Sequence, residues 1–301
     1  MIISHLMGGL GNQMFEYAAG LAIAHKHRTI LKLDTSFYHQ HEVDDRHYSL
    51  NCLNINELFA TSNEVWKFNG GITRMEKIAR YACKAAGLHQ WANQLTPTGS
   101  AHYQPTWEYY PEFEEITDNS WLHGNYQSEK FFRSISGILR HHFTFRYPAT
   151  ERVLAMQESI KQAPSVAIHF RRGDYVTNEN FARGIGVLDF GYYNNAIRKL
   201  KSLLPAETRY YLFSDNIQDI KREYTPDVPH EFVDIFDEHN YYDKIRLMSS
   251  CDHNIIANST FSWWAAWLNS NPKKIVIAPL QWYADNHHSS EDLIPQSWER
   301  L

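Results

Sequence analysis

The chain has 301 residues and a formal net charge of −5, and 43% of its residues are hydrophobic and 14% aromatic. This composition is typical of a folded protein with room for two domains and excludes an intrinsically disordered chain. A negative net charge argues against a sequence-independent nucleic-acid binder, which needs a broad basic face. Any recognition of phosphate should therefore be local.

Cysteines, histidines and apolar runs exclude further classes. The three cysteines, Cys52, Cys83 and Cys251, are far apart and odd in number, so a disulfide framework is not indicated. The histidine pairs at 141–142 and 287–288 lack the spacing of a zinc site, and no Asp-x-Asp pair is present for Mg²⁺. No apolar run reaches the roughly eighteen residues of a membrane span. We therefore expect no metal, no transmembrane segment and a cytoplasmic location, with peripheral attachment at the inner face of the plasma membrane as an alternative.

The first elements of the chain predict a β-α-β unit. Residues 2–6 have the pattern of a buried strand, 7–13 (MGGLGNQ) form a glycine-rich turn that opens a helix, and 29–34 (TILKLD) form a second strand. The loop of such a unit lies at the ligand-binding edge of its sheet. Glycine allows positive φ there, and the start of the helix offers N–H groups to an anion or a sugar hydroxyl.

A dinucleotide site is one alternative for this turn. Gly9-x-Gly11 is followed by Asp34, which could hold a ribose, but Met14 takes the place of the third glycine and would obstruct close packing of helix on strand. A purely structural turn is the other alternative.

The middle of the chain is poorly patterned. Residues 38–120 fit an acceptor-facing region or ordinary loop and short helix equally well. Order returns at 120–126, and residues 128–142 predict one amphipathic helix capped by Ser128. The dipeptide Tyr147-Pro148 marks the expected domain boundary, which gives domains at 1–148 and 149–301.

The second half alternates regularly between strand and helix. Alternation of this kind predicts a parallel sheet with helices on both faces. Strands are expected near 165–170, 209–215, 231–236, 254–257 and 273–279, and helices at 192–204, from 216 to 224, at 242–248 and at 261–269.

Polar residues follow three of these strands, at 169–174, 214–216 and 258–260, and should meet at one edge of the sheet. Arginine guanidinium groups match phosphate oxygens, so Arg171 and Arg172 suggest an anionic, phosphorylated ligand. The alternative is a surface ion cluster in which Asp174 neutralises its neighbours.

The other two strand ends have similar alternatives. Asp215 could accept N–H groups from a guanine edge or cap the next helix. Ser259 and Thr260 could hold phosphate oxygens at a helix start or form a plain N-cap. Trp263 and Trp267 lie four residues apart, on a face better suited to core packing than to sugar stacking.

The ordered blocks GGLGNQMF, HFRRGDY, FSDN and NSTFSWWAAWL resemble the α-1,2-fucosyltransferases of glycosyltransferase family 11, particularly the soluble bacterial members. The resemblance spans most of the chain, although 38–120 carries no family signature. It implies an α/β fold of the GT-B type, with two Rossmann-like domains facing each other across a cleft. The N-terminal domain would be on the acceptor side and the C-terminal domain would bind GDP-fucose, with the last residues able to pack back on the N-terminal domain.

The resemblance also implies an activity and a site. The activity is inverting, metal-independent and cofactor-free transfer of L-fucose from GDP-β-L-fucose to the 2-hydroxyl of a terminal β-galactoside, on an oligosaccharide or a lipid-linked glycan such as an O-antigen precursor. Arg171 with His169 would contact the pyrophosphate. The resemblance does not assign the base: Asp174, the nearest carboxylate in the sequence, could accept the acceptor's proton or only orient Arg172. The implied donor-binding residues are Gly11, Asn12, Gln13, Arg171, Arg172, Asp215, Asn216, Asn258, Ser259, Thr260 and Phe261.

The chemistry of the residues agrees with this implication. Breaking the fucose–phosphate bond builds negative charge on departing GDP, which arginines and a helix N-terminus stabilise in place of a metal. Three alternatives stay open: a GDP-fucose-dependent transferase forming an α-1,6 or other linkage, an NAD-dependent dehydrogenase on two Rossmann-like domains, and a non-catalytic glycan-binding module suggested by 9 Trp and 18 Tyr.

Overall fold

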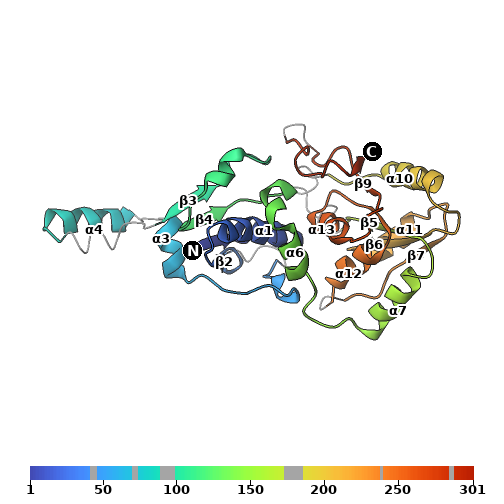
Figure 1. Cartoon of the computed structure of the whole chain (residues 1–301), viewed down its shortest axis with the longest axis horizontal. Helices are drawn as coiled ribbons and strands as arrows, with labels where there is room; N and C mark the ends of the chain where they lie inside the picture. Colours follow the sequence, from blue (N-terminus) through green and yellow to red (C-terminus); the bar gives the residue numbers. More distant parts are fainter. Residues whose placement is uncertain (41–45, 70–73, 89–98, 173–185, 238–239, 285–287) are drawn as a thin grey trace. The chain divides into compact units, whose positions relative to one another are not determined.

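The computed structural model describes residues 1–40, 46–69, 74–88, 99–172, 186–237, 240–284 and 288–301. The chain divides into two compact units, Met1–Phe143 and Thr144–Leu301, so the division falls a few residues before the expected boundary at 148. Each unit is built around a parallel sheet of its own (Figure 1). No helix among the described residues is long and apolar enough to cross a membrane.

The first unit contains a four-stranded sheet in the order β2-β1-β4-β3. All neighbouring strands pair in parallel, and helix α1 connects β1 to β2, which confirms the predicted β-α-β unit. Strand β3 was not expected, because its sequence SAHY is short and polar and lies at the sheet edge. The bounds are β1 Ile2–His5, α1 Leu10–Lys26, β2 Leu31–Asp34, β3 Ser100–Tyr103 and β4 Ser120–His123.

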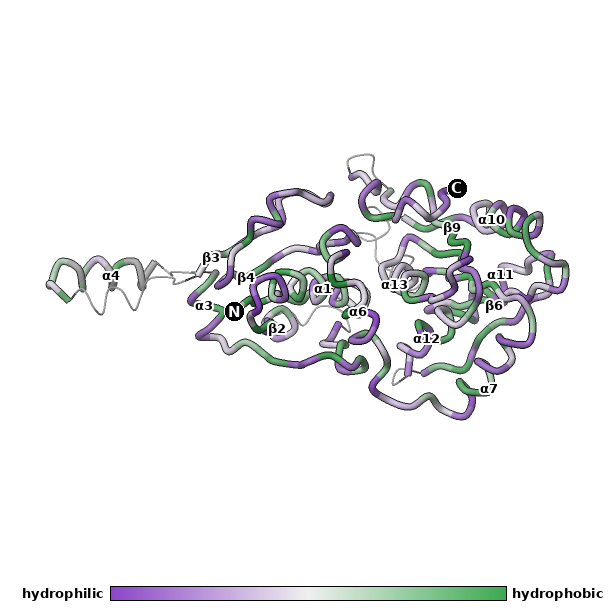
Figure 2. The backbone as a smooth tube through the Cα atoms, in the orientation of Figure 1, coloured by the Kyte–Doolittle hydropathy of each residue, from purple (hydrophilic) through white to green (hydrophobic). Residues whose placement is uncertain are grey.

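Helices cover both faces of this sheet. Small residues of α1, including Ala18, Ala19 and Ala22, are buried, so the helix packs closely, and Figure 2 shows the hydrophobic character of α1 in green. On the opposite face, Ile3 and Trp121 pack against Phe68 of the following helix α3. The other helical elements of this unit are α2 Phe37–Gln40, η1 Leu50–Cys52, α3 Ser62–Asn69, α4 Arg74–Ala85 and η2 Pro111–Glu115.

The helix predicted from 128 to 142 is interrupted. Ser128 caps as expected, but two 3₁₀ turns, η3 Glu129–Phe131 and η4 Arg133–Ile135, precede the α-helix α6 Ser136–His142. The neighbouring side chains of Phe131 and Phe132 are both fully buried. Phe131 packs against Phe113, whereas Phe132 packs against Phe15 of α1, so the two rings have different partners. The 3₁₀ turns carry these rings, and the regular helix begins only after them.

The second unit contains a six-stranded parallel sheet in the order β10-β9-β8-β5-β6-β7, and it confirms the predicted alternation. The last residues form β10 beside β9 and so belong to the sheet of this unit. The bounds are α7 Glu151–Ile160, β5 Ser165–Phe170, α10 Phe190–Leu203, β6 Arg209–Ser214, α11 Ile217–Glu223, β7 His230–Phe232, α12 Asp243–Ser250, β8 His253–Ile255, α13 Thr260–Leu268, β9 Val276–Ala278 and β10 Glu299–Arg300.

Central strand β5 is buried along its whole length. Ile168 and Phe170 face a core cluster that contains residues of α10, whereas the His169 ring contacts Phe261 of α13. Successive side chains of a strand point to opposite faces, so β5 supplies a hydrophobic core on one side and a polar group on the other. Trp263 and Trp267 of α13 are buried, as expected of core residues.

Candidate active site

One carboxylate ties together the ends of the two central strands of the second unit. Arg171 and Arg172 follow β5, and Asp215 follows its neighbour β6. A guanidinium nitrogen of Arg171 lies 2.8 Å from one Asp215 oxygen, and the backbone N–H of Arg172 donates to the other at 2.8 Å. Both oxygens of Asp215 are therefore engaged with the arginine pair.

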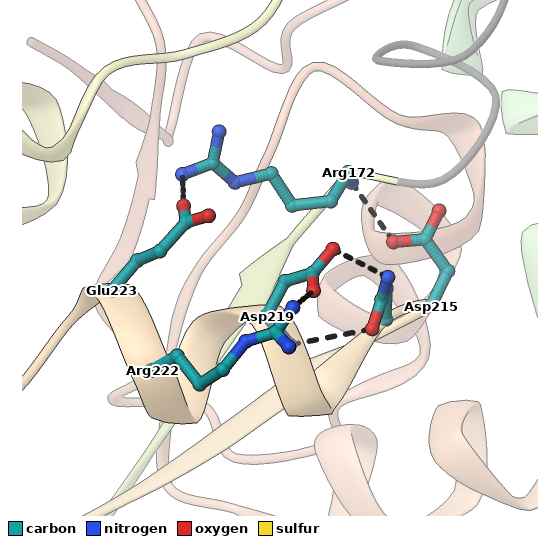
Figure 3. Close-up of polar contacts among 6 residues, drawn as sticks. Arg172, Asp215, Asp219, Arg222 and Glu223 are labelled. Carbon is teal, nitrogen blue, oxygen red and sulfur yellow. Dashed lines mark hydrogen bonds and ion pairs between the residues drawn. The ribbon is translucent and has the colours of Figure 1, made fainter.

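The two arginine side chains have different surroundings. Arg172 reaches Glu223 of α11 at 2.9 Å, as Figure 3 shows, and its guanidinium lies 4.7 Å from the centroid of the Phe190 ring. The charge of Arg172 is thus compensated by the carboxylate of Glu223 in α11. Arg171, in contrast, interacts electrostatically with His169 and Lys244, so it is the arginine that belongs with the polar groups at the strand ends.

His169 is buried and electrically neutral at neutral pH. Only 2% of the residue is exposed, and its Nδ1 has no hydrogen-bond partner among the described residues. Burial lowers the pKa of His169 to about 3, and Arg171 and Lys244 add to the lowering against the opposing effect of Asp215. Positive charge for binding an anion at this edge must therefore come from groups other than His169.

Lys244 of α12 supplies a second cation that the sequence did not reveal. Its Nζ donates to the carbonyl of Ser214 at 2.9 Å and lies 5.5 Å from the centroid of the Phe236 ring. Burial lowers the pKa of Lys244, whereas the charge of Asp215 raises it. Nothing in the sequence distinguished this lysine from a solvated residue of an amphipathic helix. Only the packing of α12 brings it beside the strand ends.

The start of α13 lies at the same edge, because β8, which precedes it, is the neighbour of β5. Ser259 is the N-cap residue of α13, but its side chain makes no capping hydrogen bond, so the plain N-cap alternative is not observed. The Phe261 ring lies between His169, at 5.9 Å, and Tyr241, at 6.4 Å between ring centroids. An uncapped helix start offers N–H groups to an anion.

Two predicted donor-binding residues have structural contacts. The side chain of Asn258 is 2% exposed and donates to the carbonyls of Gly186 and Trp282. Asn216 caps α11 by accepting from the backbone N–H of Asp219 at 3.3 Å, so Asn216, rather than Asp215, takes the capping role. Asp174 lies outside the described residues.

In the first unit, the glycine-rich segment differs from the predicted loop. Gly8 has a φ of +63°, and a Cβ there would lie only 2.7 Å from the Nδ2 atom of Asn12. Gly11, Asn12 and Gln13 belong to the first turn of α1 rather than to a loop. The tight turn therefore depends on Gly8, where a side chain would be strained.

The buried Gln13 side chain fixes this turn. Its amide nitrogen donates to the carbonyls of Gly8 and His47, and its oxygen accepts from the backbone N–H of Ser49. A Cβ on Gly9 would lie 2.8 Å from a guanidinium nitrogen of Arg46, which places a cation beside the segment. No pattern in the sequence singles out Arg46, since it lies in the unpatterned middle region.

The strand ends of the second unit bring together groups of the kind that bind anions. Arg171 and Lys244 flank one carboxylate, the neutral His169 lies among them, and an uncapped helix start is adjacent. Donors fixed in this way stabilise negative charge that develops on a departing phosphate. Such an arrangement suits a phosphorylated ligand.

Comparison with known proteins gives the family. Residues 72–301 match Glycosyl transferase family 11, and the chain belongs to this family. It is 31% identical over 311 residues to the alpha-1,2-colitosyltransferase of Escherichia coli, covering 100% of this chain and 99% of the relative. It is also 31% identical over 315 residues to the O-antigen biosynthesis glycosyltransferase WbnK of Escherichia coli, covering 99% of each.

Solved structures agree on the fold. NodZ alpha-1,6-fucosyltransferase co-crystallised with GDP has a TM-score of 0.50 and 16% identity, covering 88% of this chain and 90% of that one. The same enzyme soaked with GDP-fucose gives a TM-score of 0.50 and 16% identity over 92% of this chain and 94% of that one. The chain therefore has the α/β fold of the GT-B transferases, as the sequence predicted.

Proposed function

We propose that the protein is an inverting galactoside α-1,2-fucosyltransferase. It moves L-fucose from GDP-β-L-fucose to the 2-hydroxyl of a terminal β-galactoside, without a metal. The observation that carries the proposal is the edge of the second sheet, where Arg171 and Lys244 flank Asp215 beside the uncapped start of α13.

The chemistry of the donor edge follows from its charges. As the bond between fucose and the β-phosphate breaks, the negative charge grows on GDP and interacts with Arg171, Lys244 and the N–H groups at the start of α13. These interactions strengthen in the transition state, so they raise the rate rather than only the affinity. Attack by the acceptor hydroxyl on the opposite side of the anomeric carbon inverts its configuration.

The names of the relatives support the linkage and the acceptor class. The colitosyltransferase is an α-1,2 enzyme, and WbnK is a glycosyltransferase of O-antigen biosynthesis. We infer a glycan acceptor, free or lipid-linked, at the cytoplasmic side of the membrane. The colitosyltransferase also favours a second candidate donor, which carries colitose in place of fucose. We do not propose a dehydrogenase or a non-catalytic glycan-binding module, because both of these relatives are named as glycosyltransferases.

A transfer assay tests the proposal. The protein is incubated with GDP-fucose, and in parallel with GDP-colitose, together with lactose, N-acetyllactosamine and methyl β-galactoside, and the products are identified by mass and linkage analysis. We expect α-1,2-linked fucose on galactose at an initial rate that EDTA does not change. Preference for GDP-colitose would mean that the donor sugar is colitose rather than fucose. A product with another linkage would mean that a different acceptor hydroxyl reacts. An absolute need for Mg²⁺ or Mn²⁺ would contradict the role proposed for Arg171 and Lys244. Oxidation of NADH without sugar transfer would indicate the dehydrogenase.

A further inference from the structure

The carboxyl edge of the first sheet carries its own row of polar and aromatic side chains. Asp34, His5, His123 and Tyr103 are the last residues of β2, β1, β4 and β3, which lie in this order across the sheet. His5 is the register partner of Asp34, and Tyr103 is that of His123. Ligands of parallel α/β sheets bind outside the carboxyl ends of the strands. The row therefore occupies the ligand-binding edge of its unit.

Asp34 is a buried carboxylate held by three donors. One oxygen accepts from His5 Nδ1 at 3.0 Å and from Trp121 Nε1 at 2.9 Å, and the other accepts from the backbone N–H of Ser36 at 3.0 Å. Burial acts to raise the pKa of Asp34, but these hydrogen bonds lower it to about 2. The carboxylate is therefore ionised at neutral pH and fixed in orientation.

An ionised partner determines which nitrogen of His5 carries the hydrogen. In the neutral form of the ring, Nδ1–H donates to Asp34 and the lone pair is on Nε2. Nε2 has no hydrogen-bond partner within the described part of the chain. The ring contacts those of Trp121 and His123, with centroids at 5.4 and 5.0 Å, and these two rings stack on each other at 5.5 Å. A histidine held by a buried carboxylate in this way is oriented to accept a proton.

The neighbouring residues give this edge the character of a sugar site. His123 stacks on His5, and burial lowers the pKa of His123, with His5 adding to the effect against the opposing effect of Asp34. Tyr103 is 59% exposed, and its ring lies 5.3 Å from that of His123. An exposed aromatic ring offers an apolar surface to the C–H face of a pyranose, beside a base that can reach one of its hydroxyls.

We propose that His5, held by Asp34, is the general base of the transfer, and that the acceptor pyranose binds along this edge against Tyr103. The assignment rests on the proposed function. The acceptor oxygen bonds to the anomeric carbon, the bond from that carbon to the β-phosphate oxygen breaks, and its electron pair leaves with GDP. The acceptor proton passes to His5 Nε2, and the carboxylate of Asp34 stabilises the imidazolium until the proton is released to water.

Kinetics of His5→Gln test the assignment, with GDP-fucose as donor and lactose as acceptor. Glutamine can keep the hydrogen bond to Asp34 but is not a base, so kcat should fall by about 10²–10⁴ while the KM for lactose changes little. The affinity for GDP, measured by calorimetry, should stay unchanged because the donor edge belongs to the other unit. His142→Gln is the matched control: His142 is hydrogen-bonded to Tyr17 and distant from the row in sequence, and its loss should leave kcat unchanged.

Chemical rescue separates a base from a structural residue. His5→Ala removes the ring that contacts Trp121 and His123 beside Asp34, and we expect added imidazole to occupy its place and restore part of the lost kcat. Asp34→Asn should lower kcat without such rescue, because the native imidazole is still present but in the wrong orientation.

The outcomes are distinguishable. If the wild-type protein transfers fucose and a folded His5→Gln variant keeps kcat within about threefold of wild type, His5 is not the base. The His5–Asp34 pair, called the dyad below, then loses its role, and the proposed function stays intact. Loss of activity in His5→Ala that imidazole does not restore also overturns the base role. A wild-type protein that transfers fucose to no member of the β-galactoside panel overturns the proposed function and the dyad with it.

Discussion

The two sheets end in carboxyl edges of opposite chemical character. In the second unit, Asp215 is flanked by the cations Arg171 and Lys244. In the first unit, Asp34 has a comparable place at a strand end but is held by an imidazole and an indole. The same topological rule brings each carboxylate to its edge. The side chains around each carboxylate determine the chemistry of the edge: cations suit it to compensate negative charge, whereas an imidazole suits it to accept a proton.

Arg171→Lys should have the largest effect at the cationic edge. Lysine keeps the charge but loses the planar pair of donors, so it cannot contact the β-phosphate through two hydrogen bonds. We expect kcat to fall by about 10²–10³, together with weaker donor binding, as for other donors to a developing anion. Steady-state kinetics on the folded variant measure both effects.

Arg172→Lys is the control for this prediction. Its side chain is bound to Glu223 and packs on Phe190, so we expect a smaller loss of kcat. Equal losses for the two variants would mean that both arginines act on the substrate or that both are structural.

Lys244→Met should weaken the affinity for GDP by about tenfold, which is the size of one lost charge-assisted hydrogen bond. The thioether side chain keeps most of the packing of α12 but removes the cation beside Asp215. Lys244→Arg preserves the charge and should retain most of the affinity. Calorimetric titration of GDP at low and high salt compares the affinities of the two variants with that of wild type. An unchanged affinity in Lys244→Met would show that this lysine does not contact the donor.

Glu16→Gln tests a buried acid of the first unit. Glu16 of α1 is fully buried, and burial raises its pKa well above the ordinary value of 4.5, although the hydrogen bond from the Met7 N–H opposes this. The folded protein therefore holds a proton that the unfolded chain releases, and stability falls as pH rises above 4.5. We expect the melting temperature of Glu16→Gln to exceed that of wild type most at alkaline pH. Parallel curves of Tm against pH would show that Glu16 is ionised in the folded state.

His169→Gln should show the opposite dependence in the second unit. The pKa of His169 is lowered from 6.5 to about 3, so the unfolded chain binds a proton that the folded protein does not. Stability is then lost as pH falls below 6.5. We expect wild type to lose more thermal stability than His169→Gln on acidification from neutral pH to about 5. An equal loss would mean that His169 is protonated in the folded protein.

The sequence predicted the second unit well because its strands and helices are marked by strong hydrophobic periods. Alternation also predicted opposite faces for Arg171 and Arg172, and the two side chains have different ion-pair partners. The interrupted helix at 128–142 could not be foreseen, since Phe131 and Phe132 pack against aromatic rings of other elements, Phe113 and Phe15 respectively.

The parts of the sites that the sequence missed depend on tertiary packing. Lys244 and His5 lie in an unremarkable helix and a short strand, and neither belongs to a recognisable motif. Lys244 lies beside the strand ends because α12 packs against the end of β6, and His5 is held in place because β2 brings Asp34 beside it. Pairs formed between adjacent strands or packed elements carry no local sequence signal.

Titration of GDP into the wild-type protein tests the central claim most directly, which is that the cationic edge holds a nucleoside diphosphate. Calorimetry should show much tighter binding of GDP than of AMP or NAD⁺, since charge-assisted hydrogen bonds to two phosphates combine with recognition of the guanine base. Equal affinities for the three nucleotides, or no measurable binding of GDP, would contradict the account.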